Sequence, residues 1–379
     1  MKIEIFKSRE LIKQPHYKSF SPTKINGPWT WEDGKINTLL AEANRKLGSL
    51  DAFSVRVPDI DVFIEMHIAK EATKSSKIEG TRTEIEDVLK TGKNISPEQR
   101  DDWQEVHNYI DAMNSSMNKL NTIPLSTRLL KQAHKVLLSG VRGEHRKPGN
   151  FRTSQNWIGG ATINDAIYIP PVHTEVNELM GDLENFLHNT HIDVPVLIRA
   201  GIVHYQFETI HPFLDGNGRI GRLLITLYLV SSGLLAKPSL YISDFFEKHR
   251  QIYYDNLNNV RIKNDMGQWI RFFLAGIIET SNKGIDTFTS ILALNEEIVG
   301  NRIPKLGKKF QTAKQLLKFL YKKPITSAGE IHKKLEVSLP TANSLLSDFM
   351  GLGILIETTG YKRNREFEFS DYLNLFKDS

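Results

Sequence analysis

Apolar residues recur at helical spacing along most of the chain up to about residue 297. Within residues 31–50, for example, Leu39, Ala43 and Leu47 fall on one side of a helix. Residues 193–208 are apolar on most sides, which predicts a buried helix. The same periodicity predicts helices over residues 60–90, 99–139, 174–189, 219–233, 243–262 and 266–282.

Three stretches depart from this pattern. Residues 1–30 hold three prolines and predict an extended arm rather than a helix. Residues 147–171 alternate short β-prone pieces with Gly and Asn and end on Pro-Pro, as a hairpin followed by a turn does. Residues 298–309 mix Gly, Pro and Lys, which predicts a linker.

Beyond this linker the pattern changes to three short helices followed by a pair of alternating strands. That layout is typical of a winged helix, a variant of the helix-turn-helix, over residues 310–379. The third helix, residues 339–351, would present Thr341, Asn343 and Ser344 as a recognition helix does.

The hairpin after this helix carries Lys362, Arg363 and Arg365, as the wing of a DNA-binding unit does. The predicted recognition helix itself contains no Arg or Lys. Two interpretations therefore stay open for this unit: DNA binding, and a module for protein contact or dimerisation.

Composition places the chain among soluble globular proteins. Of its 379 residues 40% are apolar and 25% are charged, and no apolar run is long enough to span a bilayer. The absence of cysteine excludes disulfides and thiolate metal sites, and it favours a cytoplasmic setting. The opening residues, MKIEIFKSRELIKQ, are too charged for a signal peptide.

The net charge of +5 is unevenly distributed. Residues 302–379 hold 14 Lys and Arg against 8 Asp and Glu, so the other 301 residues carry a net charge of −1. A nucleic-acid contact would therefore be sought in the C-terminal segment.

The densest group of chemistry-bearing residues is HPFLDGNGRIGR, residues 211–222. Its Gly-Asn-Gly segment lets the backbone expose consecutive N–H groups just before a helix, whose N-terminus carries partial positive charge and suits phosphate. Arg219 and Arg222 are three apart and face the same way, so more than one phosphate is expected.

Asp215 and His211 complete the set. Asp215 is the single carboxylate beside the predicted phosphates, and such a carboxylate holds Mg²⁺ together with phosphate oxygens and water. His211 is the group in reach whose pKa suits proton abstraction near neutral pH. A plain helix-capping turn is the simpler alternative, but a cap needs neither the arginines nor the histidine. His204, on the predicted buried helix, is interpreted as structural.

The motif resembles the signature of the Fic family, His-x-Phe-x-Asp/Glu-Gly-Asn-Gly-Arg-x-x-Arg, and matches it at every fixed position. Proteins of this family mostly transfer AMP from ATP to a hydroxyl of a target protein. The resemblance implies that His211 deprotonates the hydroxyl, that Asp215 holds Mg²⁺, and that Arg222 lies nearest the γ-phosphate. The nucleotide-binding set that it implies is Gly216, Asn217, Gly218, Arg219, Ile220, Gly221 and Arg222.

The stretch SSKIEG, residues 75–80, resembles the inhibitory motif of the same family, Ser/Thr-x-x-x-Glu-Gly/Asn. Ser75, Glu79 and Gly80 take its fixed positions. The resemblance implies that Glu79 pairs with Arg222, so that ATP binds weakly or in an unproductive pose. A solvated helix face with a Ser/Glu pair one turn apart is the alternative.

Residues 149–171 resemble the flap of the family. Ile158, Gly159 and Gly160 would pair there with an extended segment of the target, so that its hydroxyl points at His211. An ordinary surface hairpin is the alternative.

Tyr253 and Tyr254 follow the motif at the distance where the family contributes to the adenine pocket. Aromatic residues at such positions are equally compatible with an ordinary core.

The prediction for the fold is a mainly α-helical protein: a Fic-type helical bundle with a β-hairpin flap, and a C-terminal α+β winged helix. Its parts are an N-terminal helical region with the inhibitory helix over residues 1–100, the Fic catalytic core over 101–297, the linker over 298–309 and the winged helix over 310–379.

The predicted function is that of a self-inhibited protein adenylyltransferase, which uses Mg²⁺ and ATP to modify a Ser, Thr or Tyr hydroxyl of a target protein or of itself, releasing pyrophosphate. The alternatives are a DNA-binding regulator whose Fic core senses nucleotide, a de-AMPylase in which Glu79 positions water, and transfer of UMP or phosphocholine. The resemblance implies a homodimer. The expected partners are ATP, the target protein and DNA through the winged helix, with no membrane contact.

Overall fold

The computed structural model describes residues 1–56, 60–90, 95–141, 143–360 and 365–377. These residues are mostly helical, as predicted. The helices of the main body are α1 (Gly34–Arg56), α2 (Ile60–Ile78), α3 (Ile85–Leu89), α4 (Arg100–Leu120), α5 (Thr127–Leu137), α6 (Val176–His188), α7 (Val196–Ile210), α8 (Asn217–Ser231), α9 (Ser243–Lys248), α10 (Arg250–Lys263) and α11 (Met266–Glu297). No helix in the described ranges is both long and apolar enough to cross a membrane.

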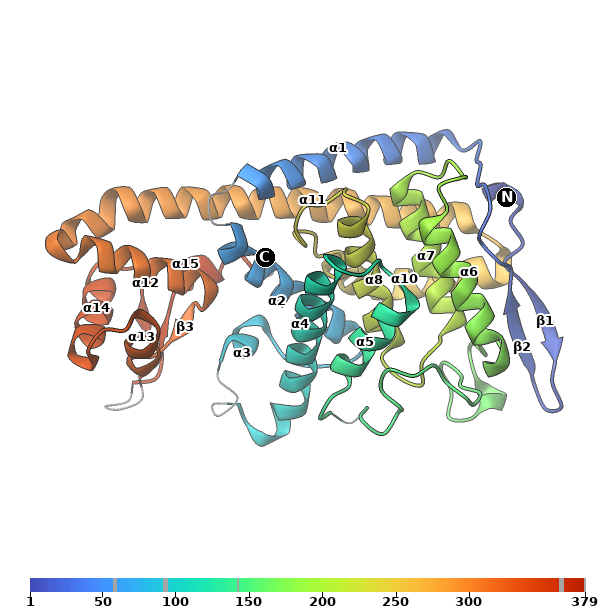
Figure 1. Cartoon of the computed structure of the whole chain (residues 1–379), viewed down its shortest axis with the longest axis horizontal. Coiled ribbons are helices and arrows are strands. Elements are labelled where there is room, and N and C mark those ends of the chain that lie inside the picture. The colour runs from blue at the N-terminus through green and yellow to red at the C-terminus, as the bar shows by residue number, and fades with distance from the viewer. Residues whose placement is uncertain (57–59, 91–94, 142, 361–364, 378–379) are drawn as a thin grey trace.

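The long helices α1 and α11 lie side by side along one edge of the molecule, and the other body helices gather beneath them (Figure 1). Leu47 and Leu50 of α1 are fully buried. A Cβ at Gly284 of α11 would lie 2.8 Å from the Leu50 side chain, so glycine at this position lets the two helices approach closely. This pair forms a wall against which α7 packs.

Helices α7 and α8 flank the HPFLDGNGRIGR motif and form the centre of the body. Every residue of α7 from Leu197 to Ile210 is buried, which confirms the prediction of a buried helix. The indole N–H of Trp269 in α11 donates to the carbonyl of Gly201 at 2.8 Å and fixes α7 in place. Residues 211–216 therefore form a short loop that connects two buried helices.

The N-terminal arm is more ordered than its prolines predict. It contains a short 3₁₀ turn and an antiparallel pair, β1 (Arg9–Lys13) with β2 (Lys18–Pro22). Leu11 faces Phe20 across this pair, and Phe20 is buried. Burial of Ser19, Phe20 and Pro22 of β2 against the body explains why strands form here.

The predicted β-hairpin flap, in contrast, has little strand structure. Within residues 149–171 one isolated antiparallel bridge joins Ile158 to Tyr168. Gly159 and Gly160 both have positive φ, at +70° and +73°, and turn the chain back at once. Between the bridge partners the chain forms a 3₁₀ turn over Ile163–Asp165 rather than paired strands.

The predicted linker, residues 298–309, is helical. Helix α11 continues into a π-helical turn over Ile298–Arg302 and a 3₁₀ segment over Ile303–Lys309. Ile298 and Ile303 are fully buried. Their packing favours the helical path in spite of the Gly and Pro content of the segment.

The C-terminal part contains the three helices and the following pair of strands expected from the sequence, and in addition a short first strand and a final helical turn. Its three strands form an antiparallel sheet in the order β3-β5-β4. The elements are α12 (Phe310–Lys322), β3 (Ile325–Thr326), α13 (Ala328–Leu335), α14 (Leu339–Gly351), β4 (Ile356–Glu357), β5 (Phe367–Glu368) and α15 (Ser370–Leu373).

This C-terminal unit packs against α2, and the end of the chain lies near that helix in Figure 1. Tyr321 of α12 packs edge-on against Phe63 of α2, with ring centroids 4.8 Å apart. Phe376 packs against His67 of α2 at 5.3 Å. Helix α2 is therefore covered on this side by aromatic side chains.

Replacing Tyr321 by Ala should destabilise the protein by about 3–5 kcal/mol, because it empties a buried aromatic position. Tyr321→Phe is the matched control, since the Tyr321 hydroxyl has no hydrogen-bond partner among the described atoms. Chemical denaturation followed by fluorescence measures both variants. Equal stability of the two variants would contradict the contact with α2.

Candidate active site

The loop of residues 211–216 turns sharply between α7 and α8. His211 adopts the left-handed conformation (φ 50°, ψ 60°) at the end of α7, and Gly216 (φ 74°) does so just before α8. Asn217 braces the loop, because its Oδ1 accepts the N–H of Phe213 at 2.8 Å and its Nδ2 donates to the Phe213 carbonyl at 2.9 Å. Left-handed backbone at a non-glycine residue costs about 1–3 kcal/mol, and such bracing holds His211 there.

His134 of α5 positions Asp215. Its ring stacks almost parallel on Phe213, with centroids 3.8 Å apart. Its Nδ1 accepts the N–H of Gly149 at 2.8 Å, so Nε2 carries the proton and donates to the Asp215 carbonyl at 2.9 Å. Burial lowers the pKa of His134 to about 4, so the ring stays neutral near pH 7. The Asp215 carboxylate itself is 42% exposed and is accessible to a ligand.

Both arginines of the motif are buried and paired with carboxylates from other helices. Arg219 donates from Nη1 to Oε2 of Glu105 in α4 at 2.9 Å. Arg222 donates from Nε to the Ser75 hydroxyl at 2.9 Å, and from Nη2 to the Ser75 carbonyl at 2.9 Å and to Oε1 of Glu79 at 2.6 Å. The pairing of Glu79 with Arg222 is therefore present. We call the contacts among Ser75, Glu79 and Arg222 the clamp.

The end of α2 delivers the clamp residues. Helix α2 ends at Ile78, and Gly80 (φ 104°) donates its N–H to the Lys77 carbonyl as the chain turns away. Ser75 and Glu79, one turn apart, both face Arg222. Ser75 is fully buried and bonded to Arg222, which favours the paired arrangement over a solvated helix face, while the Glu79 side chain is 33% exposed.

The Glu79 carboxylate lies over the first turn of α8. A Cβ at Gly218 would lie 2.1 Å from Oε1 of Glu79 and 3.0 Å from Nη1 of Arg222. Glycine is required here, because any side chain would displace the carboxylate. A helix N-terminus attracts anions through its free N–H groups and its dipole. Glu79 thus occupies the position where the sequence predicts phosphates.

Two carboxyl groups near Arg222 have opposite pKa shifts. Burial raises the pKa of Glu79. The charge and the hydrogen bond of the Arg222 guanidinium lower it, and the net shift is downward. Glu208 of α7 packs against Gly221, where a Cβ would lie 2.2 Å from its Oε1. Burial raises the pKa of Glu208 to about 7. Glu79 is therefore the ionised partner of the arginine, and Glu208 holds its proton more firmly than an ordinary glutamate.

His211 is neutral at the same pH. Burial, and then the charges of Arg261 and Arg152, lower its pKa to about 3. Its Nδ1 is buried and has no hydrogen-bond partner among the described atoms. A neutral imidazole with an unpaired ring nitrogen can accept a proton from a substrate.

Arg152 and Asn156 tie the flap segment to the loop. The backbone N–H of Arg152 donates to the Pro212 carbonyl at 2.8 Å, and its Nε donates to the His211 carbonyl at 3.0 Å. Nδ2 of Asn156 donates to the Phe213 carbonyl at 3.0 Å. Three successive loop carbonyls are thus held by one short segment.

The predicted flap residues lie beyond this fixed base. The N–H of Ile158 donates to the Tyr168 carbonyl at 2.9 Å, and Gly159 and Gly160 are exposed at the tip. Trp157 beside them is 41% exposed. The structure therefore places Ile158, Gly159 and Gly160 on an exposed turn whose base is bonded to the motif.

The two tyrosines proposed for an adenine pocket differ in environment. Tyr253 is buried, and its hydroxyl lies 2.9 Å from Nε2 of His204, whose Nδ1 lies 2.9 Å from the Gly221 carbonyl. His204 is fully buried, in agreement with a structural role. Tyr254 is partly buried, and burial followed by the charge of Glu79 raises its pKa.

Sequence reasoning missed several residues of this site. Glu105 and His134 come from helices whose sequences carry no motif, and folding alone brings them to Arg219 and Asp215. Glu208 lies one turn before His211, so its helical spacing could have indicated it. The others that were missed are Arg152 and Asn156.

Asp215 is the single candidate for metal binding here. No group of three or more His, Asp or Glu side chains suited to a metal ion occurs among the residues that the structure describes. A cation held by one carboxylate takes its other ligands from substrate and water, as Mg²⁺ does with phosphates.

Replacing Glu79 by Gln should lower the free energy of unfolding at about pH 7. The difference from the parent protein should shrink as the pH falls below 4.5, the ordinary pKa of a glutamate side chain. The sign follows because a carboxylate with a lowered folded-state pKa contributes stability above its unfolded pKa and loses it on acidification. Denaturant unfolding at two pH values measures the difference. Glu84→Gln, at an exposed pair with Lys77, is the control and should give no such pattern.

Known proteins share both domains of this body. The Fic/DOC family N-terminal domain matches residues 37–118, and the Fic/DOC family domain matches residues 124–229. The chain is 30% identical over 177 residues to Protein adenylyltransferase Fic of Aedes aegypti, and 29% identical over 189 residues to the protein of that name in Drosophila melanogaster. These matches cover 44% and 48% of this chain, and 32% and 34% of those proteins. The chain thus spans about a third of the length of the curated relatives it matches.

Solved structures agree on the fold. A Fic family protein from Desulfovibrio desulfuricans G20 aligns over 90% of this chain and 98% of its own, with a TM-score of 0.58 and 22% identity. A Fic domain containing signaling protein from Bacteroides thetaiotaomicron VPI-5482 aligns over 68% of this chain and 97% of its own, with a TM-score of 0.52 and 16% identity. The two matched domains contain Ser75, Glu79 and the whole 211–222 motif, and the chain belongs to the Fic/DOC family.

Proposed function

We propose that this protein is a protein adenylyltransferase that transfers AMP from ATP to a hydroxyl of a target protein and is restrained by Glu79. The observation that carries the proposal is the position of the Glu79 carboxylate, bonded to Arg222 over the first turn of α8. An anion already sits where an anionic substrate would bind, beside a neutral histidine with an unpaired nitrogen.

The nucleotide would take the place that Glu79 occupies. The backbone of residues 216–218 and the N-terminus of α8 would bind phosphate oxygens, with Arg219 and Arg222 as the cationic partners. Ile220 and Gly221 would contribute backbone only, because the Ile220 side chain is fully buried. Ile158, Gly159 and Gly160 would align the target chain, and Tyr253 and Tyr254 would border the adenine.

In the transfer step, His211 removes the proton of the target hydroxyl as its oxygen attacks the α-phosphorus of ATP. The new oxygen–phosphorus bond forms while the bond from that phosphorus to the bridging oxygen breaks, and pyrophosphate leaves with the electron pair. Negative charge develops on the phosphoryl oxygens, and the two arginines lie where they would stabilise it.

Asp215 would hold Mg²⁺. Its carboxylate is 42% exposed, and Oδ2 faces the backbone of Gly143, where a Cβ would lie 3.2 Å away. One accessible carboxylate beside a phosphate site fits a cation that keeps water and phosphate ligands. The bound cation would offset charge on the leaving pyrophosphate.

The winged-helix assignment of residues 310–379 stays a prediction, as do the homodimer, the cytoplasmic setting and the domain boundaries. Thr341 and Ser344 of α14 are exposed, and so are Lys333 and Lys334 on α13. Those side chains are compatible with DNA binding. Lys362 and Arg363 of the predicted wing lie outside the described residues.

Replacing Glu79 by Gly should raise AMP transfer by about tenfold or more, because a hydrogen bond to a charged group is worth about 1.5–3 kcal/mol. Intact-protein mass spectrometry after incubation with Mg-ATP measures the AMP adduct. Adding His211→Ala should lower the rate by about 10²–10⁴-fold, the usual contribution of a general base.

Glu84→Gly is the matched control, because Glu84 pairs with Lys77 away from the clamp. Equal adduct formation by the parent and Glu79→Gly would remove the inhibitory role. If the parent removes AMP from a target that already carries it, and Glu79→Gly does not, the result would instead favour the de-AMPylase. Formation of a UMP or phosphocholine adduct from the corresponding donor, in place of an AMP adduct, would show that the protein transfers that group instead of AMP.

Asp215→Asn in the Glu79→Gly background should lower transfer by about a hundredfold or more, since the cation that offsets phosphate charge is lost. Chelation of divalent cations should stop the reaction in the parent, and added Mg²⁺ should restore it. Full activity of Asp215→Asn in the presence of chelator would exclude a metal role for this carboxylate.

A further inference from the structure

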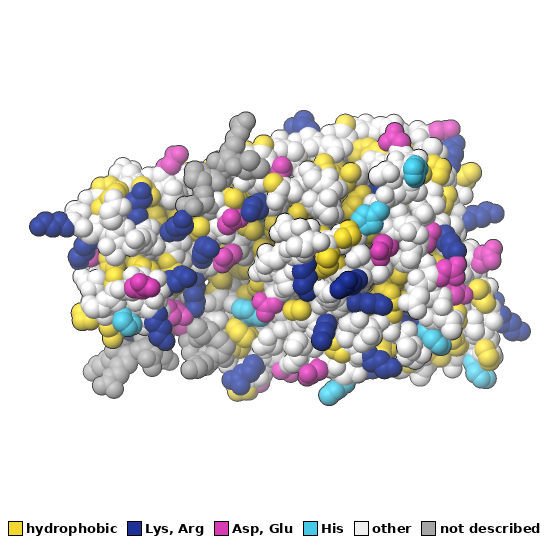
Figure 2. Space-filling model, in the orientation of Figure 1, with side chains coloured by type: hydrophobic (Ala, Val, Ile, Leu, Met, Phe, Trp, Pro, Cys, Tyr) yellow, Lys and Arg dark blue, Asp and Glu magenta, His cyan; other side chains and the backbone are white. Residues whose placement is uncertain are grey.

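Helix α5 carries cations that have no acidic partner. Arg128, Lys131 and Lys135 lie one turn apart along its outer face. Arg146 and Lys147 in the following loop are exposed beside them. Within the described part of the chain none of these five forms an ion pair. We call them the basic stripe, and Figure 2 shows Lys and Arg side chains gathered over the position of α5.

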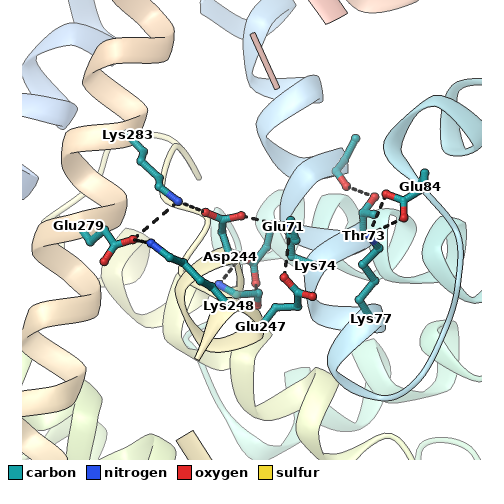
Figure 3. Close-up of polar contacts among 12 residues, drawn as sticks. Glu71, Thr73, Lys74, Lys77, Glu84, Asp244, Glu247, Lys248, Glu279 and Lys283 are labelled. Carbon is teal, nitrogen blue, oxygen red and sulfur yellow. Dashed lines mark hydrogen bonds and ion pairs between the residues drawn. The ribbon is translucent and has the colours of Figure 1, made fainter. Parts of the chain in front are cut away.

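Several lysines elsewhere in the body pair with carboxylates of neighbouring helices. In Figure 3, Lys74 and Lys283 approach the carboxylate of Asp244 at 3.4 and 2.7 Å, and Lys248 pairs with Glu279 at 3.0 Å. Those cations hold helices together. In the basic stripe, Lys147 donates to the Thr153 hydroxyl at 2.9 Å and Lys131 lies over the Phe151 ring, but neither contact neutralises a charge, so the positive charge is available to a partner.

Few acidic groups offset the basic stripe. Glu144 lies in the adjoining loop, and Glu184 of α6 accepts the N–H of Thr127 at 2.7 Å at the start of α5. Residues 127–150 contain six Lys and Arg and one acidic residue, Glu144, so this stretch of the chain has a positive excess. The excess contrasts with the net charge of −1 over the first 301 residues.

The basic stripe borders an open groove of about 520 Å³. Helix α5 forms one side of the groove, and Pro148, Gly149 and Asn150 form the other. Gly149 leads into the segment that is tied to the motif loop, and its N–H is the one that fixes His134. The groove therefore opens beside the base of the flap.

A single aromatic layer separates this groove from the motif loop. The Lys131 ammonium lies 3.9 Å from the ring centroid of Phe151, and Phe151 contacts Phe213 with centroids 5.3 Å apart. The opposite face of α5 carries His134, which bonds to Asp215. Because a helix is about 10 Å across, the groove begins about that far from the loop.

We propose that the basic stripe binds an acidic segment of the target protein next to the residue that is modified. This inference rests on the proposed function, because it takes the loop as the place where the target hydroxyl reacts. An extended chain advances about 3.3 Å per residue, so acidic residues about three to five positions from the hydroxyl would reach the stripe. Exposed ion pairs are individually weak, so several are needed for selectivity.

Fluorescence anisotropy of the full chain with two labelled peptides tests the proposal. Each peptide carries one Thr, flanked at those positions by Asp in one and by Asn in the other. The Asp peptide should bind about tenfold more tightly at low salt, as three weak pairs would give. Arg128→Gln/Lys131→Gln/Lys135→Gln should remove the preference, and Gln keeps the helix propensity of α5.

Lys305→Gln/Lys308→Gln/Lys333→Gln is the matched control, because it removes the same charge from exposed lysines of the C-terminal unit and should leave the preference intact. Equal binding of the two peptides would overturn the proposal. So would a preference that survives in the stripe variant, or duplex DNA that binds through the stripe more tightly than the Asp peptide.

Binding is measured without ATP, so it is independent of AMP transfer. The same peptides are then incubated with Mg-ATP and the Glu79→Gly form, and the adduct is measured by mass spectrometry. If the Asp peptide binds through the basic stripe but no AMP adduct forms on either peptide or on the protein, the proposed binding surface would be supported and the proposed function contradicted. An adduct formed equally on both peptides would support the function and overturn the stripe.

Discussion

The buried guanidinium of Arg222 is the constraint on which this structure depends. Its side chain is 1% exposed, and a cation removed from water is costly unless an anion and hydrogen-bond acceptors surround it. Ser75 supplies two acceptors and Glu79 supplies the anion. Burial lowers the pKa of Arg222, but the charge of Glu79 together with the nearby Tyr253, Tyr254 and Glu208 raises it by more, so the guanidinium keeps its charge. An anion must therefore lie at the first turn of α8.

Helix α2 can satisfy this requirement because other contacts hold it independently of the clamp. Lys74 bonds to Glu247 of α9 at 3.2 Å (Figure 3). Glu71 accepts the N–H of Ser243 at 3.0 Å. The C-terminal unit covers the same helix through Phe63 and His67. Several neighbours thus fix α2: α8 through the clamp, α9 through polar bonds, the C-terminal unit through aromatic packing, and α4, whose Tyr109 hydroxyl donates to Glu71 at 3.3 Å. The Glu79 carboxylate is one contact among many, so its removal is compatible with an intact helix.

The sequence predicted what depends on local spacing. The helices follow from apolar periodicity, and the phosphate-binding chemistry of the motif follows from its residue types and spacing, whereas the Glu79–Arg222 pair was expected only from the resemblance to the Fic family. It did not predict partners distant in the chain, such as Glu105 and His134, because each is an ordinary residue on an amphipathic helix until the fold brings it to the loop. Nor did it predict that residues 298–309 are helical, because burial of Ile298 favours a helix in a segment whose composition favours a break.

Under the proposed function, one electrostatic requirement serves both restraint and substrate binding. The space above Gly218 holds one anionic group, so Glu79 and a phosphate exclude each other there. Glu79 competes as a tethered group, whose effective concentration is of order millimolar or higher for short connections. A triphosphate brings more charge, but it must displace an anion that is always present. The strength of the restraint by Glu79 therefore depends on how firmly α2 is held. Residues of α9 and of the C-terminal unit that pack against α2 contribute to that strength, although they lie far from the reacting atoms.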